Sequence, residues 1–155
     1  TIAPEQLMED ALTLNFGALS RHNVTVQRAY EPVAPFTADK HKILQILLNL
    51  INNAMYACED NGDREKIITL QIFSSGSDRL SMRVTDNGMG IAPENLTRIF
   101  QHGFTTRKTG HGFGLHSGAL AANELGGSLT VHSDGPGLGA SFTLELPLLS
   151  RSDKV

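Results

Sequence analysis

Residues 39–59 read DKHKILQILLNLINNAMYACE and predict one long core helix. Thr37 or Asp39 can cap the start of the helix, and the Asp-Asn-Gly turn at 60–62 ends it. Apolar side chains cover most of its circumference, but polar ones recur at i, i+4, i+7, i+8 and i+11 and form one stripe. The stripe is either the solvent-facing side of the helix or the lining of a ligand or metal site, since buried amides need polar partners. Its members are Gln45, Asn49, Asn52, Asn53 and Tyr56.

The segments around this helix predict an α/β domain. Helical spacing runs from Pro4 to Ser20, and alternation of apolar and polar residues predicts strands at 24–28, 128–132 and 140–146. Residues 68–72 and 80–84 also alternate, with turn residues 74–78 between them, which is typical of an antiparallel hairpin. Helices are expected at 93–100 and 115–125. This order predicts a two-layer α/β sandwich, a mixed sheet with helices on one face, over residues 1–149, followed by a tail or linker at 150–155.

The composition is that of an ordinary globular domain. With 155 residues, 40% hydrophobic side chains and a formal net charge of −3, the chain can bury one full core. The lack of a basic run disfavours nucleic acid or an anionic membrane as a direct partner. The longest apolar stretch, Ile43–Ile51, is shorter than the ~20 residues that span a bilayer. Cys58 is the only cysteine, which excludes an intramolecular disulfide and a thiolate zinc site.

Two glycine-containing segments in the second half of the chain are candidates for a ligand site. The strand at 80–85 ends in DNGMG (86–90), where glycines next to a carboxylate let a ligand approach the backbone. Such a sequence on its own is usually a turn. Residues 100–115 read FQHGFTTRKTGHGFGL, with three glycines directly before a helix and hydroxyl and basic groups at 105–108. This pattern is typical of a phosphate site, and plain flexibility is the alternative.

Taken in order, these segments resemble one family. The run NLINNA (49–54), DNGMG (86–90), the pair Phe100 and Phe104, and GHGFG (110–114) are similar to the catalytic ATP-binding domain of sensor histidine kinases. The resemblance covers nearly the whole chain, as far as FTLELP at 142–147. It implies the Bergerat-type ATP-binding fold, shared with the gyrase, heat-shock chaperone and mismatch-repair ATPases, and the cofactors ATP and Mg²⁺.

The resemblance also implies roles on the adenine and metal side of the site. Asn53 would present its amide oxygen to Mg²⁺, and Asn49 would line the phosphate side. Asp86 would accept a hydrogen bond from the adenine amino group, and Gly88 and Gly90 would let the base lie against the backbone. The other positions implied to contact the nucleotide are Tyr56 (or Ala57 beside it), Ile91, Phe113, Leu115 and Thr143.

The remaining implied positions belong to a lid over the phosphates. Phe100 and Phe104 would anchor its ends, and Arg107 or Lys108 would lie near the γ-phosphate. The groups implied to hold the triphosphate or line the lid are Thr105, Thr106, Gly110, His111, Gly112 and Gly114.

Position 49 favours a kinase over an ATPase. The ATPase relatives place a water-activating glutamate there, whereas an Asn49 amide cannot act as a general base. Asn49, Arg107 and Lys108 are therefore the expected catalytic residues, and the γ-phosphoryl group is expected to go to another acceptor. No histidine of this chain is followed by the acidic residue of the family's acceptor motif, so we expect that acceptor on a separate domain. The alternative is a nucleotide-responsive docking module without phosphotransfer.

Partners and location follow from the same resemblance. The expected partners are the dimerisation and histidine-phosphoacceptor domain of the same kinase and the receiver domain of a response regulator. We expect a cytoplasmic, monomeric fragment without nucleic acid or direct membrane contact, whether or not the full-length protein carries a membrane anchor.

Overall fold

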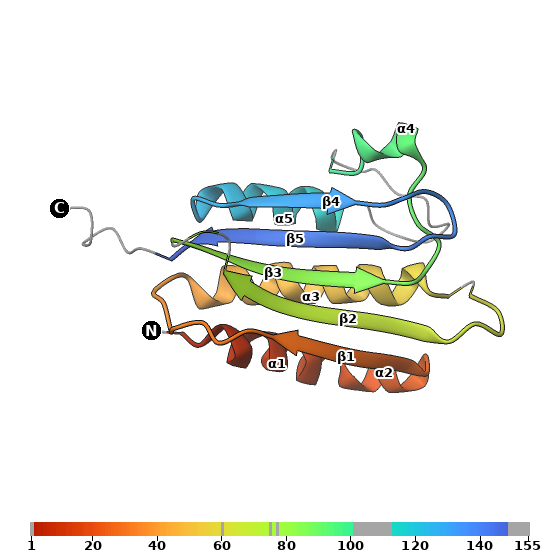
Figure 1. Ribbon diagram of the computed structural model, residues 1–155, viewed down its shortest axis with the longest axis horizontal. Coiled ribbons are helices and arrows are strands. Elements are labelled where there is room, and N and C mark those ends of the chain that lie inside the picture. Colours follow the sequence, from red (N-terminus) through yellow and green to blue (C-terminus); the bar gives the residue numbers. More distant parts are fainter. Residues whose placement is uncertain (1, 60, 75, 77, 101–112, 149–155) are drawn as a thin grey trace.

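The computed structural model describes residues 2–59, 61–74, 76, 78–100 and 113–148. Its sheet has the strand order β1-β2-β3-β5-β4, in which β1 runs parallel to β2 and the other neighbours are antiparallel. Figure 1 shows α1, α2, α3 and α5 on one face of this sheet, with the short α4 near its β4 edge. The predicted two-layer α/β sandwich with a mixed sheet is confirmed. The strands are β1 Val24–Tyr30, β2 Lys66–Ser74, β3 Arg79–Asp86, β4 Ser128–His132 and β5 Ala140–Pro147, and the helices are α1 Pro4–Leu14, α2 Phe16–Arg21, α3 Lys40–Ala57, α4 Pro93–Leu96 and α5 Phe113–Glu124.

The core lies between the sheet and the helix layer. In β5 buried and half-buried residues alternate strictly, so that one side of the strand packs under the helices. Helix α3 covers the middle of the sheet with seven buried residues, among which Ile43, Leu47 and Ile51 are completely inaccessible. Burial of this apolar stripe, rather than helix propensity, is what stabilises α3.

The predicted start of α3 is confirmed. Asp39 is the N-cap, and its side chain accepts a hydrogen bond from the Lys42 N–H at 3.2 Å. The polar stripe faces away from the sheet: Gln45 and Tyr56 are exposed, and the three asparagines of the stripe are half-buried.

The single helix predicted from Pro4 to Ser20 is wrong, because the chain forms two helices that break at Asn15. This residue has φ −101° and ψ 6°, and its N–H is shared between the carbonyls of Ala11 and Leu12. Asparagine is a weak helix former, so the turn is tolerated there. The predicted pattern continued across this break through Leu14, which is exposed and does not contribute to the core, to Ala18 in α2.

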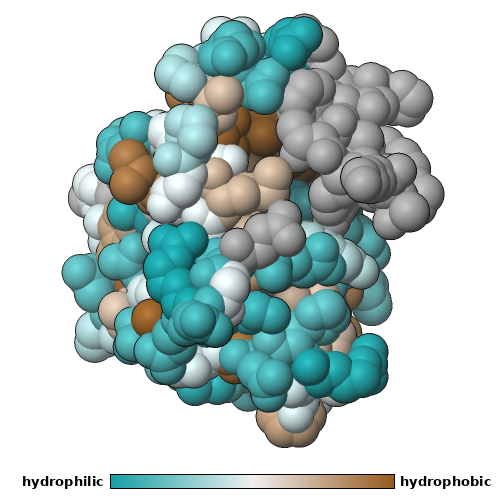
Figure 2. Space-filling view, turned by 90° about the vertical axis from the view of Figure 1, so that its right-hand side faces the viewer, coloured by the Kyte–Doolittle hydropathy of each residue, from teal (hydrophilic) through white to brown (hydrophobic). Residues whose placement is uncertain are grey.

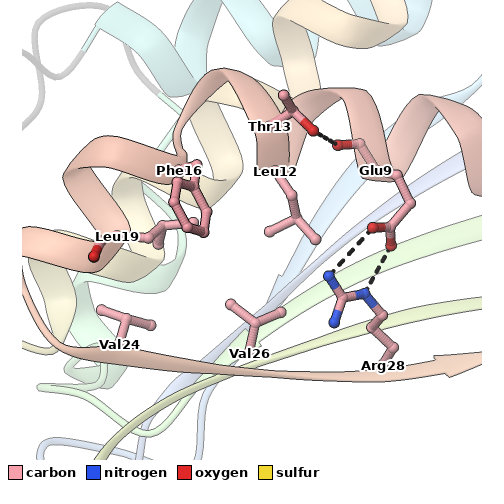
Figure 3. Close-up of a pocket in the computed structure, with 9 residues that line it drawn as sticks. Glu9, Leu12, Thr13, Phe16, Leu19, Val24, Val26 and Arg28 are labelled. Carbon is pink, nitrogen blue, oxygen red and sulfur yellow. Dashed lines mark hydrogen bonds and ion pairs between the residues drawn. The ribbon is translucent and has the colours of Figure 1, made fainter.

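Helices α1 and α2 pack over β1, and a groove of about 610 Å³ lies between the two helices and this strand. Glu9 of α1 and Arg28 of β1 close one end of this groove with a bidentate pair at 2.8 and 3.2 Å (Figure 3). The apolar lining consists of Leu12, Phe16, Leu19, Val24 and Val26.

The ends of three elements meet at one end of the molecule, on the right in Figure 1: the carboxyl ends of α3 and β3 and the amino end of α5. The turn between β4 and β5 lies at the same end. Figure 2 faces this end and shows apolar surface recessed between hydrophilic groups. The fold thereby brings the ends of α3 and β3, which carry two of the predicted motifs, to the same end of the molecule as the start of α5.

Candidate nucleotide-binding site

Asp86 is a carboxylate buried at the end of a core strand. It is the last residue of β3, lies opposite Ala140 of β5, and is only 5% exposed. Burial raises the pKa of its carboxyl group to about 6, against the opposing effect of backbone hydrogen bonds from Gly88 and Ala140. The Gly88 N–H donates to Asp86 Oδ1 at 2.8 Å. A buried carboxylate in this position is a strong hydrogen-bond acceptor for a ligand.

The glycines after Asp86 are required by the protein itself. A Cβ at Gly88 would collide with the Ala57 carbonyl at the end of α3. Gly90 has φ +72°, and a Cβ there would collide with the Gly135 carbonyl. We expected these glycines to make room for a base, but the structure gives both of them a packing reason within the chain.

Backbone hydrogen bonds hold the loop at 86–91 from two sides. On the helix side, the Met89 N–H donates to the Ala57 carbonyl at 2.8 Å. On the turn side, the Gly137 N–H donates to the Met89 carbonyl at 2.7 Å, and the Gly139 N–H donates to the Gly88 carbonyl at 3.2 Å. The loop is therefore a fixed part of the fold.

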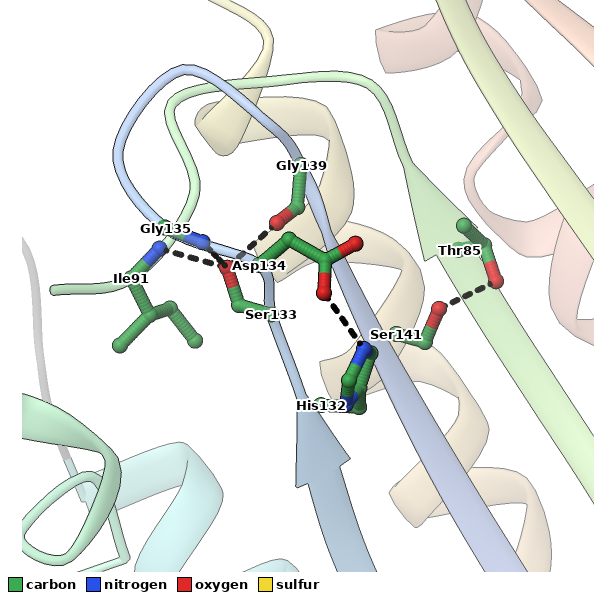
Figure 4. Close-up of polar contacts among 8 residues, drawn as sticks. All are labelled: Thr85, Ile91, His132, Ser133, Asp134, Gly135, Gly139 and Ser141. Carbon is green, nitrogen blue, oxygen red and sulfur yellow. Dashed lines mark hydrogen bonds and ion pairs between the residues drawn. The ribbon is translucent and has the colours of Figure 1, made fainter. Parts of the chain in front are cut away.

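Ser133, which the sequence analysis did not single out, joins this loop to the β4–β5 turn (Figure 4). Its Oγ accepts from the N–H groups of Ile91 at 3.0 Å and Gly135 at 3.3 Å, and it donates to the Gly139 carbonyl at 2.7 Å. A serine directly after a strand, followed by Asp and Gly, is typical of a turn in which the hydroxyl bonds nearby backbone groups. This local pattern does not reveal that the hydroxyl also bonds the loop at 86–91.

Asn49 and Asn53 lie one turn apart on the outer side of α3, and both are half-buried. Beyond the backbone hydrogen bonds of α3, the Asn53 side chain makes no hydrogen bond with another described residue. Its amide oxygen is thus available to a cation, and an amide oxygen is a ligand that Mg²⁺ accepts.

Tyr56 and Ala57, the two alternatives for the contact with adenine, are the last two residues of α3. The ring of Tyr56 lies edge-on to that of His22, with 6.3 Å between the centroids, at the turn that follows α2. The backbone of Ala57 contacts the Asp86 loop through Gly88 and Met89. These contacts are on the protein side, and which of the two residues touches adenine stays a prediction.

Phe100 and Leu115 flank the segment at 101–112. The Phe100 ring packs edge-on against Phe142 at 6.3 Å, and Leu115 is buried in the core. His116, the residue after Leu115, is hydrogen-bonded through Nδ1 to the Phe100 carbonyl oxygen at 3.0 Å. His116 Nδ1 is the donor, because a carbonyl oxygen can only accept. Ile91 packs half-buried against the same core. Phe100 therefore packs against the core, and its role as an anchor of the lid stays a prediction.

Thr143 does not belong to the site, and this prediction is wrong. It alternates with Phe142 and Leu144, which point toward the helices, so its side chain lies on the open face of the sheet. There its hydroxyl accepts a hydrogen bond from Arg83 Nε at 2.9 Å. Asp86 and α3 lie on the other face.

Most of the predicted phosphate side falls on residues outside the described ranges. Phe113 and Gly114 lie at the start of α5, but the structure describes only their backbone. These assignments stay predictions, and the residues concerned are Phe104, Thr105, Thr106, Arg107, Lys108, Gly110, His111 and Gly112.

Comparison with known proteins identifies the family. Residues 38–150 match the model of the histidine kinase-, DNA gyrase B- and HSP90-like ATPases. The chain belongs to this family. It is 40% identical to the sensor histidine kinase ZraS of Salmonella typhi over 123 residues, which are 79% of this chain and 25% of that protein. It is 32% identical to the sensor protein FixL of Bradyrhizobium diazoefficiens over 143 residues, covering 92% of this chain and 28% of that protein. The chain thus spans about a quarter of these relatives.

Solved structures share the fold. Full-length ShkA in complex with AMPPNP superposes with a TM-score of 0.83 at 26% identity, over 96% of this chain and 31% of that one. The nucleotide-free catalytic domain of the histidine kinase ThkA gives a TM-score of 0.81 at 24% identity, over 94% and 92% of the two chains.

None of the helices in the described part of the chain is long and apolar enough to cross a membrane.

Proposed function

We propose that this chain binds Mg·ATP where α3, β3 and α5 meet, and that it is the catalytic domain of a sensor histidine kinase. In this role it transfers the γ-phosphoryl group of ATP to a histidine on a separate phosphoacceptor domain. The buried Asp86 carboxylate, held by backbone donors beneath the end of α3, is the observation that carries the proposal. Membership of the family and the similarity to ZraS, FixL and AMPPNP-bound ShkA support it.

Asp86 would recognise the base. Its carboxylate accepts hydrogen bonds, and the adenine amino group donates them, so the pair discriminates adenine from a base with a carbonyl at the same position. Low exposure strengthens such a bond, which contributes roughly 1.5–3 kcal/mol when one partner is charged. The fixed 86–91 loop means that little ordering cost remains when the base enters.

Asn53 would bind the metal ion. No cluster of three or more carboxylate, imidazole or thiolate side chains that could hold an ion occurs in the described part of the chain. A weak protein site with one amide ligand suits Mg²⁺ that arrives bound to the phosphates of ATP. The ion would neutralise phosphate charge during transfer.

Asn49 would keep the bound ATP from being hydrolysed. It lies one turn before Asn53, where a carboxylate could deprotonate an attacking water molecule, and its amide cannot do so. The phosphoryl group is thereby retained for an acceptor.

Addition of a histidine-phosphoacceptor domain from a related sensor kinase tests this function. With γ-labelled ATP we expect slow phosphate release from the chain alone and transfer of label to the acceptor histidine, but not to an acceptor with that histidine replaced by alanine. Binding of ATP without any transfer would favour a docking module, and rapid phosphate release from the chain alone would favour an ATPase.

A further inference from the structure

Asn87 joins the Asp86 loop to the connection between α3 and β2. Its Oδ1 accepts hydrogen bonds from the Ile67 N–H at 3.0 Å, from Asn61 Nδ2 at 3.1 Å and from the Cys58 thiol at 3.5 Å. Its Nδ2 donates to the Glu65 carbonyl at 2.7 Å. Both ends of the amide are therefore satisfied, and its orientation is fixed because an N–H can only donate and a carbonyl can only accept.

This side chain takes the place of a strand residue. The register of β2 and β3 ends at the pair Ile68 and Asp86. One residue later the Asn87 N–H still donates to the Ile67 carbonyl at 3.3 Å, and the side-chain amide pairs with the Ile67 N–H and the Glu65 carbonyl. The ladder is thus continued past Asp86 by a side chain, and the backbone after Asp86 keeps a fixed direction.

A chain of hydrogen bonds runs from Asn87 through Asn61 and Arg64 to the β4–β5 turn, which holds the loop at 86–91 from its other side. Asn61 is only 8% exposed, and its Oδ1 accepts from Arg64 Nη2 at 3.1 Å. Arg64 Nη1 donates to the Gly137 carbonyl at 3.4 Å, and the Gly137 N–H donates to the Met89 carbonyl at 2.7 Å. Asn87 is the member of this network that lies directly beside Asp86.

We propose that Asn87 is a positioning residue that sets the direction of the Asp86 carboxylate for recognition of the purine 6-amino group. The proposal rests on the function proposed above. The Gly88 N–H that binds Asp86 Oδ1 follows Asn87 in the chain, so the torsions that Asn87 fixes also direct this donor. Without the Asn87 amide the carboxylate keeps its charge but loses its fixed direction, and with it the preference for an amino purine.

The ratio of two dissociation constants reports this role. ATP carries an amino donor at position 6 of the purine, and ITP carries a carbonyl acceptor there; the sugar and phosphates are the same. A substitution that only loosens the fold weakens the binding of ATP and ITP by the same factor. A substitution that turns the Asp86 carboxylate away from the 6-amino group weakens mainly the binding of ATP, and so lowers the ratio of Kd for ITP to Kd for ATP.

The variants are Asn87→Ala, which removes the amide, and Asn87→Asp, which puts an oxygen against the Glu65 carbonyl. Asn61→Ala is a milder variant that removes one donor to Asn87 Oδ1 and leaves the backbone pairing of Asn87 in place. Ile72→Val is the matched control, since it loses a methyl group from a fully buried side chain near the other end of β2. Kd values for both nucleotides are measured by competition against a fluorescent ATP analogue, on samples whose folded fraction is checked by circular dichroism.

We expect the two Asn87 variants to lower the ratio by about tenfold and Asn61→Ala by about threefold, with Ile72→Val within about twofold of the native chain. A native ratio in the folded Asn87 and Asn61 variants would overturn the proposal, even if both affinities fell. Asp86→Asn distinguishes a failure of the proposed adenine site from a failure of the role proposed for Asn87. If Asp86→Asn leaves the ratio unchanged, the assignment of Asp86 to adenine fails. If it abolishes the preference while the Asn87 and Asn61 variants keep it, only the role of Asn87 fails.

Discussion

The carbonyl of Ala57, at the end of α3, occupies the space that a side chain at Gly88 would need. The neighbouring Met89 N–H donates to the same carbonyl at 2.8 Å. The end of the central helix and the loop that follows Asp86 are therefore in direct backbone contact, and the position of Asp86 relative to α3 depends on that contact.

Gly88→Ala should separate these two backbones. Because the obstacle is a carbonyl group and not a flexible side chain, we expect a loss of at least about 2 kcal/mol in the free energy of unfolding. Urea denaturation measures it. Gly17→Ala in α2 is the control, since a methyl group there meets only the end of Arg21 at 3.5 Å. It should stabilise the helix by about 0.5–1 kcal/mol. Equal stability of Gly88→Ala and the native chain would contradict the observed contact.

The ionisation of Asp86 should oppose folding. Its pKa is about 6 in the folded chain against a reference value of 3.8, so the folded state binds more protons between these values. The stability that this group contributes is complete below about pH 4 and is lost as the pH rises through 6. Relative to Asp86→Asn, the native chain should lose about 2–3 kcal/mol between pH 4 and pH 8. Urea denaturation of both chains across this range tests the sign, and a constant difference would refute it.

Asn53→Ala should remove most of the effect of Mg²⁺ on nucleotide affinity. We expect a loss of about tenfold in affinity for an ATP analogue with Mg²⁺ present and little change in excess EDTA. Asn52→Ala, which alters the adjacent half-buried amide of the same stripe, is the control and should keep the response to Mg²⁺. Calorimetric titration measures all three chains, and equal losses with and without the ion would argue against metal binding by Asn53.

Glu9 should stabilise the contact between α1 and β1 without affecting the nucleotide site. Hydrogen bonding from Arg28 lowers the pKa of the Glu9 carboxyl, and the Tyr30 hydroxyl donates to it at 2.7 Å. Because this pKa is lower in the folded chain, the ionised Glu9 carboxylate contributes to the free energy of unfolding at pH values above the ordinary pKa of a glutamate. That contribution is lost as the pH falls through the lowered pKa. Because the Glu9 and Arg28 side chains are 39% and 48% exposed, Glu9→Gln should cost less than about 1 kcal/mol at pH 7.

Two measurements check the role of Glu9. Urea denaturation should show that the cost of Glu9→Gln shrinks in high salt, which screens exposed ion pairs. The affinity for nucleotide should stay at the native value, because Glu9 lies at the groove beneath α1 and not at the Asp86 end. A loss of nucleotide affinity would show that the two regions are coupled.

The regular elements could be predicted from the sequence because their patterns are local. The cap at Asp39, the hairpin of β2 and β3, and the alternation in β5 all lie within short windows, and all are present. The break at Asn15 was missed because Leu14, although exposed, and Ala18 continued the helical spacing across it.

The contacts that position Asp86 could not be predicted because they join distant segments. Asn87 meets Glu65 and Ile67, which lie 22 and 20 residues away, and Ser133 meets Ile91 at a separation of 42. Thr143 was misplaced for a related reason: a motif gives a residue its neighbours in sequence, but only the register of β5 decides which face of the sheet it occupies.

The central claim is that Asp86 and Asn53 together form a site for Mg·ATP. Calorimetric titration of a non-hydrolysable ATP analogue, with and without Mg²⁺, into the native chain and Asp86→Ala tests it most directly. We expect saturable binding that strengthens with Mg²⁺ and falls at least about tenfold in Asp86→Ala, a loss of about 1.4 kcal/mol or more. Absence of binding by the folded native chain, or equal binding by the two chains, would contradict it.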